Sequence, residues 1–199
     1  VVMKKLRLLP ASGLACCDPD VELVIDKIGF GTCLLLCDSQ TMAFGVAHPL
    51  FHDSSQFAST SILNPMAYAD LVVDGLIDRL KHTHESFENL EKGAFAPRLG
   101  AVLIGGCIPL IERYEEESTP ELLAISLRTT QTIKRSLQAS EIPLRYEQTG
   151  GQHRCSIHIR GSRVTIGQER GLREPLISEI NIHHPKWQLS QEGQTQPLT

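Results

Sequence analysis

No uninterrupted apolar run in this 199-residue sequence approaches the roughly 20 residues that a membrane-spanning helix needs. The first ten residues carry charge near their start, and their apolar stretch is too short and broken for a signal peptide. We therefore expect no membrane insertion and a cytoplasmic location.

The sequence also lacks an excess of basic residues. It contains 19 Lys and Arg against 23 Asp and Glu, a formal net charge of −4. Proteins that bind nucleic acid through its phosphates usually present a clustered positive surface. The charge balance therefore argues against nucleic acid as a partner.

The usual zinc spacing is missing as well. An even number of cysteines permits disulfides, but a chain of this size without a secretion signal favours reduced thiols. His48 and His52 have a spacing that suits one helix face, yet Pro49 between them interrupts a helix. We expect neither a metal nor another cofactor. The cysteines, none of which form a CxxC pair, are Cys16, Cys17, Cys33, Cys37, Cys107 and Cys155.

What the sequence does contain is enough apolar residues, 41%, to build one sizeable core. We expect an irregular N-terminal segment at residues 1–20, one folded domain at residues 21–184 and a mobile, glutamine-rich tail at residues 185–199.

Alternating and apolar runs predict more strands than helices. One helix is expected to begin at Tyr68, and a second to carry the apolar stripe Leu122, Ile125, Ile133 and Leu137. This pattern predicts a layered α/β sandwich of mixed or antiparallel sheets flanked by two long helices. The expected strands cover residues 21–25, 28–37, 42–48, 100–107, 144–149, 155–159 and 163–166, with an edge strand at 176–182, and the expected helices cover 68–84 and 118–139.

A cysteine and a histidine stand at corresponding points of two of these strands. Cys33 follows the glycine turn Gly29–Gly31, and His48 ends the next apolar run. Neighbouring strands joined by a short turn bring such side chains together. A thiol beside an imidazole forms a nucleophilic pair, and we expect it at an open mouth. Without the glycines and His48, Cys33 would be interpreted as a core residue, as we interpret Cys37, Cys107 and Cys155.

Several motifs in the same order resemble the chemoreceptor glutamine deamidase family, CheD, over about residues 20–168. The glycine turn with its cysteine is followed by a glycine and then Ala-His, and later motifs agree in order and spacing. The matching segments are Gly29-Phe30-Gly31-Thr32-Cys33, Gly45-Val46-Ala47-His48, Tyr68-Ala69-Asp70, Arg98-Leu99-Gly100-Ala101 with Gly105-Gly106, and Ile142-Pro143 with Gly150-Gly151.

The resemblance implies hydrolysis of a side-chain amide. Members of the family convert glutamines of methyl-accepting chemotaxis receptors to glutamate, can act on glutamyl methyl esters, and pair with a CheC-type phosphatase. The family's catalytic cysteine corresponds to Cys33 and its histidine to His48.

The sequence departs from the family pattern at three places. Lys27 occupies the position of the family's catalytic threonine, six residues before the cysteine. The segment between Cys33 and His48 is two residues shorter than expected, and the family's I-G-x-R-N appears as residues 125–129, Ile-Ser-Leu-Arg-Thr.

The chemistry of the pair can be derived from its groups. Cys33 would attack the amide carbon, while His48 would protonate the leaving nitrogen and activate water. Backbone N–H groups of Gly29 and Gly31 could stabilise the oxyanion. Lys27 could favour the thiolate, and Thr32 could replace the missing hydroxyl, although neighbouring strand residues point to opposite faces. The alternative function is a catalytically impaired module that binds a CheC-type phosphatase or receptor helices.

Overall fold

The computed structural model describes residues 4–16, 20–55, 64–83, 98–106, 119–151, 153–170, 173–181 and 188–192. Cys17, Cys107, the acidic run at 112–117 and most of the expected polar connection at 84–97 lie outside these ranges. Within them, no helix is long and apolar enough to span a bilayer.

The described residues form two β-sheets and two α-helices, which confirms the expected α/β sandwich. The strands are β1 (Lys4–Arg7), β2 (Gly13–Cys16), β3 (Val21–Ile28), β4 (Thr32–Asp38), β5 (Phe44–Ala47), β6 (Leu99–Gly105), β7 (Leu144–Thr149), β8 (Cys155–Arg160), β9 (Arg163–Arg170), β10 (Arg173–Asn181) and β11 (Gln188–Glu192). The helices are α2 (Val72–Lys81), α5 (Thr119–Ala139) and the short 3₁₀ turn η2 (Pro65–Ala67).

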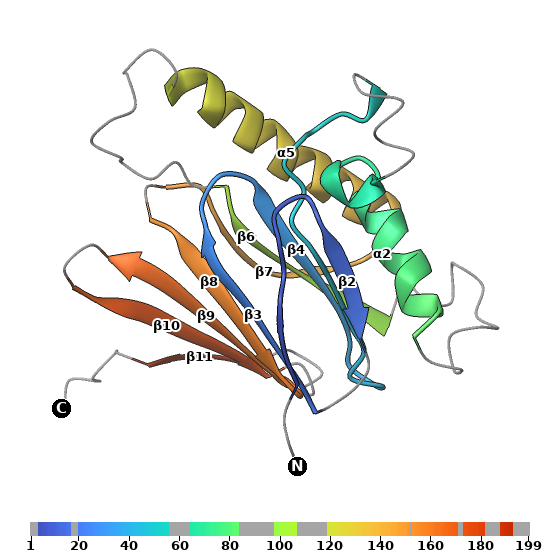
Figure 1. Cartoon of the computed structure of the whole chain (residues 1–199), viewed down its shortest axis with the longest axis vertical. Coiled ribbons are helices and arrows are strands. Elements are labelled where there is room, and N and C mark those ends of the chain that lie inside the picture. Colours follow the sequence, from blue (N-terminus) through green and yellow to red (C-terminus); the bar gives the residue numbers. More distant parts are fainter. Residues whose placement is uncertain are drawn as a thin grey trace.

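Three layers make up the molecule (Figure 1). The six-stranded sheet has the order β1-β3-β8-β9-β10-β11, and the five-stranded sheet has the order β2-β5-β4-β6-β7. Both sheets are mixed, because β1 pairs with β3 and β6 pairs with β7 in parallel, whereas the other pairs are antiparallel. Both helices cover the face of the five-stranded sheet that is turned away from the six-stranded sheet.

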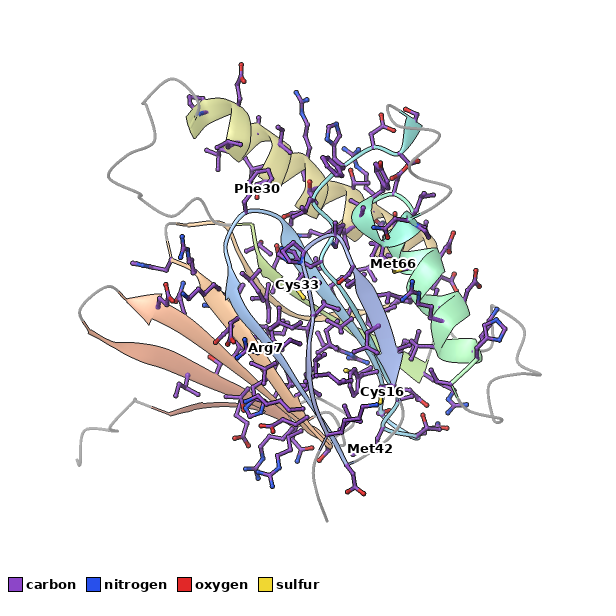
Figure 2. The ribbon with its side chains drawn as sticks, in the orientation of Figure 1. Arg7, Cys16, Phe30, Cys33, Met42 and Met66 are labelled. Carbon is purple, nitrogen blue, oxygen red and sulfur yellow. The ribbon has the colours of Figure 1, made fainter. Side chains whose placement is uncertain are left out.

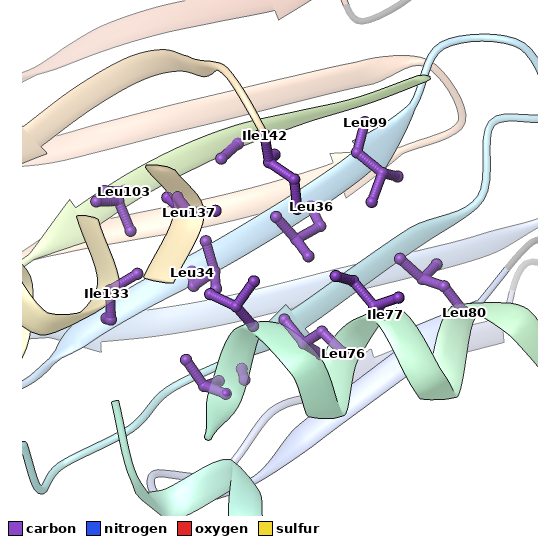
Figure 3. Packing of buried hydrophobic residues seen from close by; sticks show 14 of the residues in the cluster. Leu34, Leu36, Leu76, Ile77, Leu80, Leu99, Leu103, Ile133, Leu137 and Ile142 are labelled. Atoms are coloured by element: carbon purple, nitrogen blue, oxygen red, sulfur yellow. The ribbon is translucent and has the colours of Figure 1, made fainter. Parts of the chain in front are cut away.

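Strand β4 lies at the centre of the five-stranded sheet and is buried along its whole length. Its side chains alternate, so Leu34 and Leu36 pack against the helices while Cys33, Leu35 and Cys37 face the other sheet. A central strand covered on both sides needs an apolar run on both faces, which explains the sequence of residues 33–37. Figure 3 shows the helix-side core, where α2 and α5 contribute Leu76, Ile77, Leu80, Ile133 and Leu137.

The turn at residues 29–31 crosses from one sheet to the other. Strand β3, which precedes the turn, belongs to the six-stranded sheet, and β4, which follows it, belongs to the five-stranded sheet. The start of β4 therefore lies where the two sheets are joined, at one end of the sandwich (Figures 1 and 2).

The N-terminal segment is more regular than its sequence indicated. We expected residues 1–20 to be irregular, but β1 pairs with β3 and β2 pairs with β5. Each of these strands has four residues, too few for a periodic pattern to show. Their hydrogen bonds come from strands that lie further along the chain, β3 and β5, which local patterns do not reveal.

Two other boundaries also need correction. Helix α2 begins at Val72 rather than Tyr68, because Tyr68 is buried and forms an isolated parallel bridge with Phe51. In the segment expected to be a mobile tail from residue 185, residues Gln188–Glu192 pair antiparallel with β10. The unpaired edge of β10 supplies backbone partners, so even a polar, glutamine-rich segment can extend the sheet.

The hairpin between β4 and β5 is closed by one buried carboxylate. Asp38 accepts hydrogen bonds from the Thr41 hydroxyl at 2.6 Å and from the backbone N–H groups of Gln40 and Thr41 at 3.2 Å. The Arg98 guanidinium binds the same side chain at 2.7 Å. These contacts fix the turn at the end of β4 that is remote from Cys33.

We predict that Asp38→Ala lowers the free energy of unfolding by about 3 kcal/mol, because it leaves the largely buried Arg98 without its carboxylate partner and removes the turn bonds. Urea unfolding measures the change. The control is Glu147→Ala, which breaks the half-exposed pair with Lys134 and should cost less than about 1 kcal/mol. Equal losses in the two variants would contradict the role assigned to Asp38.

Candidate active site

Three glycine turns meet at the end of the five-stranded sheet where β4 begins. The backbone N–H of Gly106 donates to the carbonyl of Gly31 at 2.6 Å, and the N–H of Gly150 donates to the carbonyl of Gly105 at 2.8 Å. Gly105 has a φ of 101°, and a Cβ there would lie 2.9 Å from the Gly31 carbonyl oxygen. Only glycine fits this approach, so motifs far apart in the sequence form one structure.

The pairing of β4 with β5 brings the candidate nucleophile and the candidate base to the same end of this hairpin. Leu34 pairs with Ala47 at the end of β5; Cys33 directly precedes Leu34, and His48 directly follows Ala47. On β4, Cys33 faces the six-stranded sheet. That its thiol and the His48 ring lie close together stays a prediction.

Cys33 lies in the core between the two sheets. Its side chain has 0% exposure and packs in a cluster that includes Ile28, Leu35 and Ile104. Desolvation raises the pKa of its thiol far above the ordinary value. The open mouth that we expected is absent around this thiol, because two apolar sheet faces close over the start of β4. Figure 2 shows Cys33 below the turn that carries Phe30.

The His48 ring is held against the glycine turn. Its Nε2 lies 3.2 Å from the carbonyl oxygen of Phe30, and a Cβ on Gly31 would lie 3.0 Å from the same nitrogen. A carbonyl only accepts hydrogen bonds, so Nε2 carries the proton and the neutral ring has its acceptor at Nδ1. With 6% exposure, burial lowers the pKa of His48, and the bond to Phe30 offsets part of that effect.

These two environments favour an uncharged pair. Burial raises the pKa of the Cys33 thiol and lowers the pKa of the His48 imidazole, so both shifts oppose proton transfer from sulfur to nitrogen. The described conformation therefore holds thiol and imidazole in their neutral forms. Activation of the thiol requires water or substrate to reach this end of the sandwich.

The two residues considered as a third group lie elsewhere. Thr32 points to the helix side of β4, where its hydroxyl is 2.7 Å from that of Thr130 on α5. Lys27 is exposed, with a left-handed φ of 56°, at an irregularity in the pairing of β3 with β8 between Ile25 and Ile28. Neither geometry directs a polar group toward the His48 ring.

Helix α5 has a buried polar face that its apolar pattern does not reveal. Ser126, Thr129 and Thr130 are buried, although the pattern predicts an apolar stripe here through Leu122 and Ile125. Their positions continue the stripe of Ile133 and Leu137 by steps of three and four residues. Hydroxyl residues at such positions were the signal that this helix face meets a polar part of the sheet.

Among the described residues, no group of three His, Cys, Asp or Glu side chains is arranged to hold a metal ion. Cys37 and Cys155 are buried in the core between the sheets, as we expected for structural cysteines.

Comparison with known proteins gives several similar chemoreceptor glutamine deamidases. Chemoreceptor glutamine deamidase CheD of Bacillus subtilis (strain 168) is 32% identical over 143 residues, which cover 66% of this chain and 78% of that protein. The CheD protein of Bacillus velezensis is 32% identical over 157 residues, covering 72% of this chain and 86% of the relative. The chain belongs to the CheD family.

More distant relatives agree with this result. The probable chemoreceptor glutamine deamidase CheD of Clostridium novyi (strain NT) is 29% identical over 149 residues, 74% of this chain and 78% of that protein. No family model matches the chain. Within this CheD chain, the glycine turn, Cys33 and His48 form the candidate active site.

We predict that His48 makes the stability of this CheD protein depend on pH. Because the pKa of His48 is lower in the folded state than its ordinary value of about 6.5, the unfolded state binds the proton first as the pH falls. The stabilising contribution of the neutral ring is present above about pH 6.5 and is lost progressively below it. Urea unfolding between pH 8 and 5.5 measures this loss.

The control is His48→Gln, whose stability should change less over the same range. Both proteins share all other histidines, and carboxylates titrate mainly below this range. Parallel pH profiles for the two proteins would show that His48 does not titrate differently on folding.

Proposed function

We propose that this protein hydrolyses the side-chain amide of glutamines on methyl-accepting chemotaxis receptors, producing glutamate and ammonia in the cytoplasm. The observation that supports this most is the β4–β5 register, which brings Cys33 and His48 to the same end of the hairpin in a chain of the CheD family. CheD relatives are named as chemoreceptor glutamine deamidases.

The reaction begins with proton transfer from the Cys33 thiol to the unprotonated nitrogen of His48. The thiolate attacks the carboxamide carbon, and the tetrahedral intermediate collapses when the imidazolium gives its proton to the leaving nitrogen. The C–N bond breaks, ammonia leaves and a thioester remains. His48 then takes a proton from water and hydroxide attacks the thioester. The C–S bond breaks, glutamate leaves, and the imidazolium returns its proton to the thiolate, which restores the free thiol.

The glycine turn supplies the electrostatic part of the site. Backbone N–H groups around Gly29 and Gly31 are the candidates for binding the oxyanion, because the absence of side chains lets a substrate approach the backbone. Phe30, between them, already orients the imidazole through its carbonyl. The same turn therefore orients the imidazole of His48 and offers backbone N–H groups to the substrate oxyanion.

Turnover on this scheme requires the turn to move. Cys33 has no exposed surface, and the Leu50 side chain lies 2.8 Å from where a Cβ on Gly31 would be. A glutamine side chain reaches the sulfur only when residues 29–31 shift and open a path to it. Entry of the polar carboxamide also raises the local polarity, which lowers the pKa of the thiol toward its ordinary value.

We predict that the purified protein releases ammonia from a receptor cytoplasmic fragment and that Cys33→Ala lowers the rate by about 1000-fold or more, because the nucleophile is lost. A coupled ammonia assay and mass spectrometry of the receptor measure the reaction. The matched control is Cys37→Ala, a cysteine of the same strand and core, which should keep most of the rate. Unchanged release by Cys33→Ala would refute the assignment.

A second candidate function is a binding module that has lost turnover and engages a CheC-type phosphatase or receptor helices. The observation that favours it is Lys27, which is exposed and stands where the family has a catalytic threonine. The complete burial of the Cys33 side chain also favours a module without turnover. Ammonia release by the unmodified protein separates the two functions.

We predict that Lys27→Thr does not increase ammonia release and lowers the free energy of unfolding by about 1 kcal/mol. The left-handed φ of 56° at this position is unfavourable for a β-branched side chain. Lys27→Gly, which suits that backbone, is the control and should be at least as stable as the unmodified protein. A large gain in rate on Lys27→Thr would favour the impaired module.

A further inference from the structure

Three buried hydroxyl groups meet beside the glycine turns on the helix side of the five-stranded sheet. The oxygens of Ser126, Thr130 and Thr32 lie 3.1, 3.2 and 3.2 Å from the point that a Cβ on Gly106 would occupy. All three side chains are buried. This cluster lies on the opposite face of β4 from Cys33, which faces the other sheet.

The hydroxyls form a directed chain between the helix and β4. The Thr130 hydroxyl donates to the carbonyl oxygen of Ser126 at 3.1 Å, and its oxygen lies 2.7 Å from the Thr32 hydroxyl. A hydroxyl has a single hydrogen, so Thr32 is the donor in the second bond. Thr130 thus connects the backbone of α5 to the first residue of β4.

Thr32 stands next to the glycine turn, so its hydrogen bond with Thr130 restrains that turn. Thr32 lies between Gly31, whose carbonyl is bound by Gly106, and Cys33, the proposed nucleophile. One residue before Gly31, the Phe30 carbonyl holds the His48 ring. A contact that anchors Thr32 therefore restrains the segment that touches both members of the pair.

We propose that Thr130 is a positioning residue, whose hydroxyl anchors the glycine turn through Thr32 and so sets Cys33 and His48 relative to one another. The effect of Thr130 on catalysis rests on the proposed deamidase function. Its effect on local opening around Cys33 is independent of that function.

Ser126 offers a second hydroxyl that can replace Thr130 as the hydrogen-bond partner of Thr32. Its hydroxyl is buried and makes no hydrogen bond to the described residues, yet it faces the same point beside Gly106. When Thr130 loses its oxygen, the Ser126 hydroxyl can turn toward Thr32. The test therefore uses Thr130→Val alone and together with Ser126→Ala, because the double variant removes both possible acceptors.

Two variants serve as matched controls. Thr129→Val removes a buried hydroxyl from the adjacent residue. Among the described residues, the Thr129 hydroxyl bonds to the carbonyl of Ile125 within the same helix, at 2.9 Å. Thr130→Ser keeps the hydroxyl and removes only a methyl group. Thr129→Val and Thr130→Ser should resemble the unmodified protein if the anchor depends on the oxygen of Thr130.

The first measurement is alkylation of Cys33 by iodoacetamide under native conditions, followed by peptide mass spectrometry. Cys37, buried four residues further along β4, is the internal reference for global unfolding. We expect the double variant to alkylate Cys33 about tenfold faster, the effect of losing about one buried hydrogen bond, with Cys37 unchanged. Equal acceleration at both cysteines, or at neither, would overturn the inference.

The second measurement is ammonia release from the receptor fragment at varied substrate concentration. We expect the double variant to lose about tenfold in kcat with little change in KM, and Thr130→Ser to restore it. A loss confined to KM, or one shared by Thr129→Val, would contradict positioning by Thr130. Absence of release from the unmodified protein would refute the proposed function alone, because the alkylation result still decides whether Thr130 anchors the turn.

Discussion

The hydrogen bond from the Gly106 N–H to the Gly31 carbonyl is the contact on which the candidate site depends. It joins the end of β6 to the turn that carries the chain from one sheet to the other. The approach is possible because neither residue has a side chain and both adopt positive φ values. From this junction, β4 starts with Thr32 directed to the helices and Cys33 directed to the second sheet. The motifs that are spread over 120 residues of sequence thus serve one local geometry.

The same geometry creates a conflict between stability and reactivity. The sandwich gains stability by covering the start of β4 on both faces, and this coverage makes the thiol hard to ionise and the imidazole hard to protonate. A nucleophile in this place needs an opening that leaves the rest of β4 intact. A glycine turn held by a few hydrogen bonds can move without disturbing the apolar cores, which links the anchoring by Thr130 to access at Cys33.

Much of the fold could be predicted from periodicity, because most strands and the body of both helices pack an apolar face against a core. The predictions were wrong where a segment's structure depends on a partner strand rather than on its own pattern. Lys4–Arg7 and Gln188–Glu192 become strands only because β3 and β10 offer them backbone groups. Tyr68, which looked like the start of a helix, bridges to Phe51 instead.

The motifs of the sequence indicated the family and the order of the glycine turns. The short turn between two apolar runs also predicted a hairpin that brings Cys33 and His48 to one end, because such a turn leaves little freedom in the register of a hairpin. Tertiary structure alone decided that the thiol is buried, that Lys27 faces solvent and that Thr32 binds α5 instead of the histidine. The burial of the thiol and the contact of Thr32 depend on which surfaces cover β4. That coverage follows from the packing of the second sheet and the helices, most of which lie far away in the sequence.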